Sequence, residues 1–109
     1  MTAKDTKGKA KLRLVPYDAL VAIAEVREFG IKKYKDDHGW KGVDTLDFQE
    51  AAMRHLGKAL AGQEIDEESG LPHIYHALTS LAMAVAVNNF KVKDEKKCYG
   101  PQCEWEQQF

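Results

Sequence analysis

The sequence is poor in cysteine and proline, with two and three of these residues in a chain of 109. Both cysteines, Cys98 and Cys103, lie near the C-terminus, and two thiols cannot build a disulfide framework. A four-ligand zinc site would need two more ligands from elsewhere in the chain. We therefore interpret Cys98 and Cys103 as ordinary tail cysteines, with a structural zinc site as the alternative. Such low cysteine usage favours a reducing compartment, and we expect the cytoplasm.

Long apolar runs and an excess of one charge are also lacking. No stretch of about 18 apolar residues is present and the N-terminus is rich in lysine, so we expect neither a transmembrane helix nor a secretory signal. Sixteen Lys and Arg oppose seventeen Asp and Glu, a formal net charge of -1, which does not favour binding to nucleic acid. The basic residues within 1–13 are an exception. We interpret them as a solvated arm, and a nucleic-acid accessory that contacts phosphate is the weaker alternative.

Helical periodicity is what the sequence does contain, within an ordinary globular composition of 44% hydrophobic and 30% charged residues. The predicted helices run from Tyr17 to about Lys33, from Asp44 or Thr45 to about Ala61, and from Pro72 to about Phe90. We predict an all-α fold, a small helical bundle with a flexible basic arm (1–11), one helical domain (12–92) and a C-terminal tail (93–109). The first helix is apolar around most of its circumference, which favours completion of the bundle by oligomerisation.

The faces of the helices follow from their spacing. In the third predicted helix the expected core residues are Leu78, Leu81, Ala82 and Val85. A different side of that helix carries His73, His76, Ser80 and Ala84. In the second helix the apolar side is formed by Leu46, Ala52, Leu56, Ala59 and Leu60.

Residues able to do chemistry gather around the turn between the second and third helices. Because a short loop makes these helices antiparallel neighbours, His55, Glu64, Asp66, His73 and His76 should share one region. Carboxylate oxygens suit Mg²⁺, and histidines shift the preference toward Mn²⁺ or Zn²⁺. The predicted metal ligands are Glu50, His55, Glu64, Asp66, His73 and His76, and the predicted catalytic residues are Glu50, Glu64, Asp66 and His73. The plain alternatives are a solvated acidic loop and histidines that only pack or form hydrogen bonds.

Cations and aromatic side chains complete a predicted nucleotide site. Lys32, Lys33 and Arg54 would hold the phosphates of a nucleoside triphosphate beside the metal. Tyr34 and Trp40 lie in a glycine-containing loop, where they either stack on a base or cover the core.

Five segments together resemble a known family: Lys11–Pro16, Phe29–Tyr34, Trp40–Gly42, Ala51–Leu56 and, most specifically, Asp66–Ala77. The chain is similar to the phage-type dATP/dGTP diphosphohydrolase N-terminal domain family, grouped with the MazG-like all-α nucleoside triphosphate pyrophosphohydrolases. The resemblance implies a Mg²⁺-dependent enzyme, and the histidines named above leave Mn²⁺ as a second possibility. It would cleave a deoxynucleoside triphosphate, dATP or dGTP among them, to monophosphate and pyrophosphate. It also implies a homodimer or homotetramer in the host cell cytoplasm.

The acidic pattern of the chain leaves a second hypothesis open. Where the MazG-like pattern carries carboxylates on two successive helices, this sequence has Asp47 and Glu50, followed by His73 and His76. The alternative function is therefore a catalytically silent helical module that binds a nucleotide or a protein.

Overall fold

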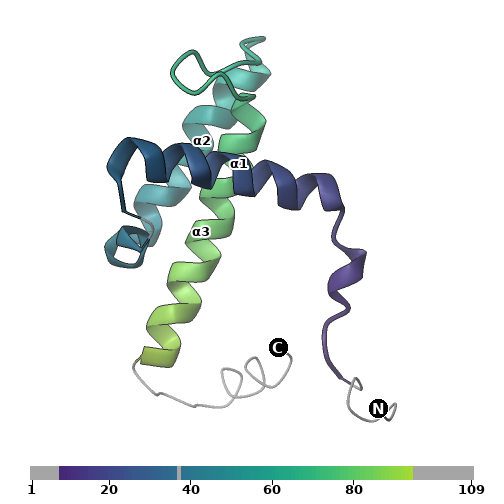
Figure 1. Ribbon diagram of the computed structural model, residues 1–109, viewed down its shortest axis with the longest axis vertical. Coiled ribbons are helices and arrows are strands. Elements are labelled where there is room, and N and C mark those ends of the chain that lie inside the picture. Colours follow the sequence, from purple (N-terminus) through teal and green to yellow (C-terminus); the bar gives the residue numbers. More distant parts are fainter. Residues whose placement is uncertain (1–7, 37, 95–109) are drawn as a thin grey trace.

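The computed structural model describes residues 8–36 and 38–94, with side chains up to residue 90. Figure 1 shows three α-helices, α1 (Tyr17–Tyr34), α2 (Thr45–Leu60) and α3 (His73–Asp94), and the two short 3-10 helices η2 (Leu12–Leu14) and η3 (Gly39–Gly42). This described part contains no strand, and its one extended pairing is an isolated bridge between Ile65 and Pro72. The predicted all-α class is confirmed. Cys98, Cys103 and most of the predicted tail lie outside the described residues, as do residues 1–7 of the predicted arm.

The ends of α2 follow from two residues. Asp44 precedes the helix, and its side-chain oxygen accepts a hydrogen bond from the backbone N–H of Leu46 at 3.0 Å, which satisfies one of the unpaired N–H groups of the first turn. At the other end, Gly62 has a positive φ of 96°. The N–H of Gly62 donates to the carbonyl of Ala59, and that of Gln63 donates to the carbonyl of Lys58. This Schellman arrangement turns the chain out of the helix and into the loop that carries Asp66.

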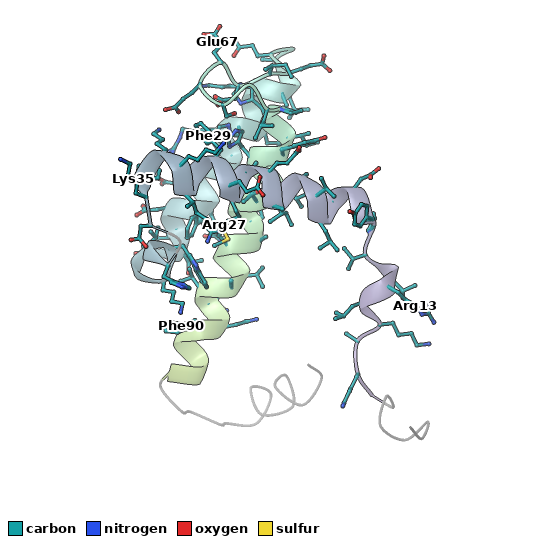
Figure 2. The ribbon with its side chains drawn as sticks, viewed as in Figure 1. Arg13, Arg27, Phe29, Lys35, Glu67 and Phe90 are labelled. Carbon is teal, nitrogen blue, oxygen red and sulfur yellow. The ribbon has the colours of Figure 1, made fainter. Side chains whose placement is uncertain are left out.

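Helix α3 is the central element. It packs along α2, and α1 lies across it (Figure 1). Arg27 and Phe29 project from opposite sides of α1 (Figure 2), so the two sides of this helix can contribute to separate surfaces. The buried apolar residues are Val87 and four alanines, Ala22, Ala52, Ala77 and Ala84, which come from all three helices. The small side chains of the alanines let the helices approach closely. The core is therefore small.

The buried face of α3 differs from the one that we predicted. Leu81 and Val85, which we expected in the core, are 50% and 61% exposed, whereas His73 and His76 are only 3% and 9% exposed. The side of α3 that carries the histidines is the side that meets α1 and α2. The larger apolar residues of α2 and α3 therefore lie on the surface of the single chain. None of the helices in the described ranges is long and apolar enough to cross a membrane.

The boundaries of the elements differ only slightly from the predicted ones. The loop expected between Tyr34 and Asp44 contains the 3-10 helix η3, and α3 continues past Phe90 to Asp94. Helix α1 is capped at its C-terminus by Lys35, a non-glycine residue with a left-handed φ of 57°.

Candidate functional site

The loop between α2 and α3 folds back on itself and begins the site. The backbone N–H of Asp66 donates to the carbonyl of Leu71 at 2.8 Å, and the N–H of Gly70 donates to the carbonyl of Asp66 at 2.8 Å. Gly70 has a positive φ of 76°, a conformation that glycine adopts without a steric cost. The N–H of His73 donates to the carbonyl of Glu64 at 2.7 Å, which satisfies one N–H group at the start of α3. The loop thus holds Asp66 beside the first turn of α3.

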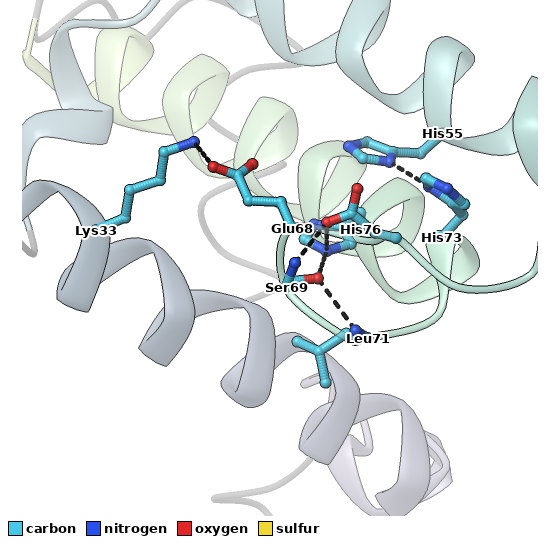
Figure 3. A network of polar contacts seen from close by, with 8 residues as sticks. Lys33, His55, Glu68, Ser69, Leu71, His73 and His76 are labelled. Carbon is cyan, nitrogen blue, oxygen red and sulfur yellow. Dashed lines mark hydrogen bonds and ion pairs between the residues drawn. The ribbon is translucent and has the colours of Figure 1, made fainter.

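Three imidazoles meet under this loop (Figure 3). His55 comes from α2, while His73 and His76 lie one turn apart on α3. The Nδ1 atoms of His55 and His73 are 2.9 Å apart, a hydrogen bond in which one ring donates and the other accepts. The rings of His55 and His76 are stacked, with centroids 4.6 Å apart and an interplanar angle of 16°. With Asp66, these rings form what we call the histidine cluster: His55, Asp66, His73 and His76.

Ser69 ties the cluster to the loop. Its hydroxyl oxygen lies 2.7 Å from Nε2 of His76 and accepts a hydrogen bond from the N–H of Leu71 at 3.1 Å. Its own N–H donates to Oδ2 of Asp66 at 3.0 Å, and the same carboxylate oxygen lies 3.6 Å from Nε2 of His76. Ser69 therefore positions both the carboxylate of Asp66 and the ring of His76.

The environment of the cluster sets its charge state. Burial lowers the pKa of His55, and the neighbouring His76 and His73 lower it further. Burial also lowers the pKa of His76, although the Asp66 carboxylate acts in the opposite direction. Burial acts to raise the pKa of Asp66, but hydrogen bonds from the hydroxyl and the N–H of Ser69 outweigh it and lower this pKa. At neutral pH, His55 and His76 are thus neutral and Asp66 is ionised, the forms in which these groups bind metals.

The donor atoms of the cluster fit a divalent cation. Ligand atoms of His55, Asp66 and His73 all lie within 4.8 Å of one another. Two ligands at right angles around a cation with bonds of about 2.1 Å lie about 3.0 Å apart, close to the 2.9 Å between the two Nδ1 atoms. His76 lies outside this group of three, and its Nε2 atom lies 2.7 Å from the hydroxyl oxygen of Ser69. Two imidazoles and one carboxylate suit Mn²⁺ or Zn²⁺ better than Mg²⁺, which prefers oxygen ligands.

A cavity of about 300 Å³ opens from the cluster toward α1, and we call it the histidine cavity. Its lining includes Lys33, His55, Asp66, Glu68 and His76. Lys33 forms an ion pair with Glu68 at this cavity (Figure 3). The hydrogen bond that the Lys33 ammonium group donates to the Glu68 carboxylate within this pair raises the pKa of Lys33. The ammonium group of Lys33, one of the predicted phosphate-binding cations, is therefore held at the same cavity as the cluster.

A second cavity of about 440 Å³ adjoins the first, and we call it the aromatic cavity. Tyr34 and Trp40, the two predicted stacking residues, both line it, and Tyr34 is 69% exposed. The carboxylate of Asp36 organises this wall, because it accepts hydrogen bonds from the N–H groups of His38 and Gly39 at 2.9 and 3.1 Å. A Cβ atom on Gly39 would lie 2.7 Å from a carboxylate oxygen of Asp36, so the side chain of Asp36 would have to shift to admit a larger residue.

The two cavities adjoin along α1 and α3. Val26, Gly30, Tyr34 and Ser80 line both. A third cavity of about 530 Å³ includes Asp66 and His73 in its lining. Residues of the histidine cluster therefore line both the histidine cavity and the third cavity, and the histidine cavity shares part of its wall with the aromatic cavity.

Four predicted site residues lie elsewhere. Glu50, Glu64, Lys32 and Arg54 are exposed, and none lines any of these three cavities. Glu50 precedes His55 by five residues, which on an α-helix is a rotation of about 140°, so its side chain leaves α2 in a different direction. Glu64 contributes its backbone carbonyl to His73, and its side chain is exposed. The roles assigned to these four residues stay predictions.

Three residues of the site had no predicted role. Ser69 and Glu68 belong to the acidic loop, but nothing in their spacing indicates which histidine or lysine they contact. Phe29 packs the edge of its ring against His76, with centroids 6.2 Å apart and an interplanar angle of 88°. The one signal that the sequence offers is the unbroken segment Asp66–Ala77, in which Ser69 precedes His76 by seven residues.

Comparisons with known proteins point in one direction. Residues 1–96 match the family described as dATP/dGTP diphosphohydrolase, N-terminal. A protein of Salmonella phage PMBT28 named dATP/dGTP diphosphohydrolase is 28% identical over 95 residues, which cover 86% of this chain. The chain spans 32% of the length of that relative. No solved structure matches the chain.

Proposed function

The chain belongs to the dATP/dGTP diphosphohydrolase N-terminal family, and from this premise we propose that it hydrolyses a deoxynucleoside triphosphate to the monophosphate and pyrophosphate. The observation that carries the proposal is the histidine cluster, in which a neutral His55 and an ionised Asp66 of the histidine cavity come together with His73. Lys33, which would bind phosphate, lines the histidine cavity, and Tyr34 and Trp40, which would stack on the base, line the adjoining aromatic cavity. These are the parts that a nucleoside triphosphate requires at its phosphates and its base.

A divalent cation is part of this proposal. His55, Asp66 and His73 would hold it, with Mg²⁺ as the expected physiological ion and Mn²⁺ favoured by the two imidazoles. When bound, such an ion neutralises phosphate charge and makes a bound water more acidic. Glu50 and Glu64 remain candidate ligands, although neither joins the cluster within the single chain.

The residues of the chain supply positioning and proton transfer. Lys33 would exchange its ion pair with Glu68 for one with the phosphates, because a triphosphate offers more negative charge than one carboxylate. Water would add to the α-phosphorus while the bond to pyrophosphate breaks, and the ionised Asp66 would accept the proton of that water. Ser69 would keep the Asp66 carboxylate oriented for this step. Tyr34 and Trp40 would stack on the base.

A catalytically silent nucleotide-binding module is the second candidate. Asp66 is the only carboxylate that joins the two histidines in the group of three, among the described residues. Phosphoryl-transfer sites that use Mg²⁺ are usually richer in oxygen ligands. Such a module would bind the triphosphate and release no product.

The partners follow from the same reasoning. We propose a homo-oligomer, a dimer or tetramer, because the large side chains of Leu46, Leu60, Leu81 and Val85 are exposed in the single chain. We expect nucleic acid not to bind, since the net charge is close to zero.

A pyrophosphate-release assay tests the proposal. Purified protein is incubated with each of the four dNTPs in Mg²⁺ and, separately, in Mn²⁺. We expect pyrophosphate and the monophosphate as the only products, and Asp66→Asn should abolish their release. Glu67→Gln, which changes an exposed carboxylate next to Asp66, is the matched control and should retain activity. Release of orthophosphate would assign the chain to another class of phosphatase, and triphosphate binding with no product would establish the silent module.

A further inference from the structure

Thr79 stands out in the wall of the aromatic cavity. It lies in the second turn of α3 and is 4% exposed. Among the described residues its hydroxyl oxygen has no hydrogen-bond partner. A threonine within a helix usually donates to the carbonyl three or four residues before it, and this one does not. A buried hydroxyl without a partner is unfavourable, so its presence calls for a reason.

The position of Thr79 supplies that reason. It follows His76 by three residues, which on an α-helix is about 4.5 Å along the axis. The same face of α3 thus carries His76 of the histidine cluster in its first turn and Thr79 in its second. Ser80, the next residue, lines both cavities, so this turn lies where they meet. A nucleotide whose phosphates lie at the cluster would extend its nucleoside along α3 toward Thr79.

The surroundings of Thr79 suit a nucleobase better than a sugar. Tyr34, Trp40, Val43 and Phe48 line the aromatic cavity with flat or apolar surface. Such a wall accommodates the face of a base, and a few polar groups in it then read the edge. In a helix, threonine occupies two χ1 rotamers, and rotation between them points the hydroxyl in a different direction. The hydroxyl can therefore turn toward a base edge at little cost.

We propose that Thr79 is a specificity residue whose hydroxyl hydrogen-bonds the edge of the substrate base in the aromatic cavity. This inference rests on the proposed function and adds the group that distinguishes one base from another. A hydroxyl both donates and accepts hydrogen bonds, so it can bond to any base edge that places an acceptor or a donor atom within its reach. A base that offers none there leaves the hydroxyl buried and unpaired, and loses affinity for that reason.

The test compares Thr79→Val, which removes the hydroxyl and keeps the shape, with Thr79→Ser, which keeps the hydroxyl. We measure kcat/KM for the four dNTPs and for the ribonucleotide of the best base. For Thr79→Val, the ratio between the best and the poorest dNTP should fall roughly three- to tenfold, the value of one neutral hydrogen bond. Thr79→Ser should keep the wild-type ratio. The melting temperature of Thr79→Val should not fall, because the variant loses an unpaired buried hydroxyl, and this measurement separates loss of specificity from loss of folding.

Three outcomes would overturn the inference. An equal loss of kcat/KM for all four dNTPs in Thr79→Val would show that the residue only packs. Unchanged base ratios with an altered preference between deoxyribose and ribose would place the hydroxyl on the sugar. Unchanged kinetics would remove Thr79 from the site and leave the proposed function intact.

A second measurement keeps the two proposals apart if the wild-type protein releases no pyrophosphate. The four deoxynucleosides, which carry no phosphate, are titrated by NMR into the wild type and into Thr79→Val. Base-dependent binding that Thr79→Val abolishes would support the inference even though the proposed hydrolysis had failed. Binding that is absent, or that Thr79→Val does not change, would refute it.

Discussion

Replacing Gly62 by alanine should destabilise the protein through the backbone alone. Gly62 has a φ of 96°, and the hydrogen bonds from the N–H groups of Gly62 and Gln63 close the C-terminus of α2. A Cβ atom at this position would meet nothing within 4 Å, so no steric clash contributes. The cost is that of placing an L-residue in a left-handed conformation, about 1–2 kcal/mol. For a domain of this size, that corresponds to a fall of about 4–16 °C in the melting temperature.

Gly57 provides the matched control. It lies inside α2 with an ordinary helical backbone, and a Cβ atom there would also meet nothing within 4 Å. Alanine in a helix interior is more favourable than glycine by about 0.5–1 kcal/mol, so Gly57→Ala should stabilise the protein. The same chemical change, five residues apart, is thus expected to have opposite signs.

Urea and thermal denaturation followed by circular dichroism measure both variants. Equal slopes of the urea transitions would show that the difference lies in the folded state. A Gly62→Ala variant as stable as the wild type, or one that shifts in the same direction as Gly57→Ala, would refute the argument from the turn. Since the turn at Gly62 leads into the loop that carries Asp66, Gly62→Ala should also weaken binding of Mn²⁺.

Three further predictions concern charge, metal and assembly. Lowering the pH from about 7.5 to about 5.5 should lower the melting temperature, because the pKa values of His55 and His76 are lower in the folded chain than in the unfolded chain. The unfolded chain therefore binds more protons over this pH range, which favours unfolding. His55→Asn should weaken the dependence of the melting temperature on pH. A wild-type melting temperature that does not change with pH would contradict this prediction. Mn²⁺ at 100 times its Kd should stabilise the protein by about 2.7 kcal/mol. Asp66→Asn should abolish this stabilisation, and Glu50→Gln should keep it. If Glu50→Gln also abolished the stabilisation by Mn²⁺, Glu50 would be a metal ligand. Leu81→Gln should reduce the molecular mass measured by light scattering, and it should destabilise the chain less than a substitution in the core, because Leu81 is half exposed. A wild-type mass equal to that of one chain would argue against the oligomer.

The helices were predictable because their signals are local. Asp44 before α2 and Gly62 after it are the residues that helix ends require, and both act as the sequence indicates. The joining of α2 and α3 by a short loop also predicted that His55, Asp66 and His73 lie together, and they do. These inferences need only helical geometry and the length of one loop.

The buried face of α3 was not predictable in the same way. The hydrophobic pattern favoured Leu81 and Val85 for the core, but α1 and α2 pack on the side of His73 and His76. Which side is covered depends on where α1 crosses, and no local signal encodes that crossing. The apolar side that stays exposed is the basis of the proposed oligomer.

The helical class, the helix ends, the family and the residue types of the cluster can all be predicted from the amino-acid sequence. The contacts of Ser69 with Asp66 and His76 and the ion pair of Glu68 with Lys33 appear only in the folded chain, as does the position of Glu50 and Arg54 outside the cavities. Helix ends and loop lengths are predictable because they depend on interactions between residues close in the chain. The direction of a side chain and its partner depend on the rotation and crossing of whole helices, which many weak contacts set together.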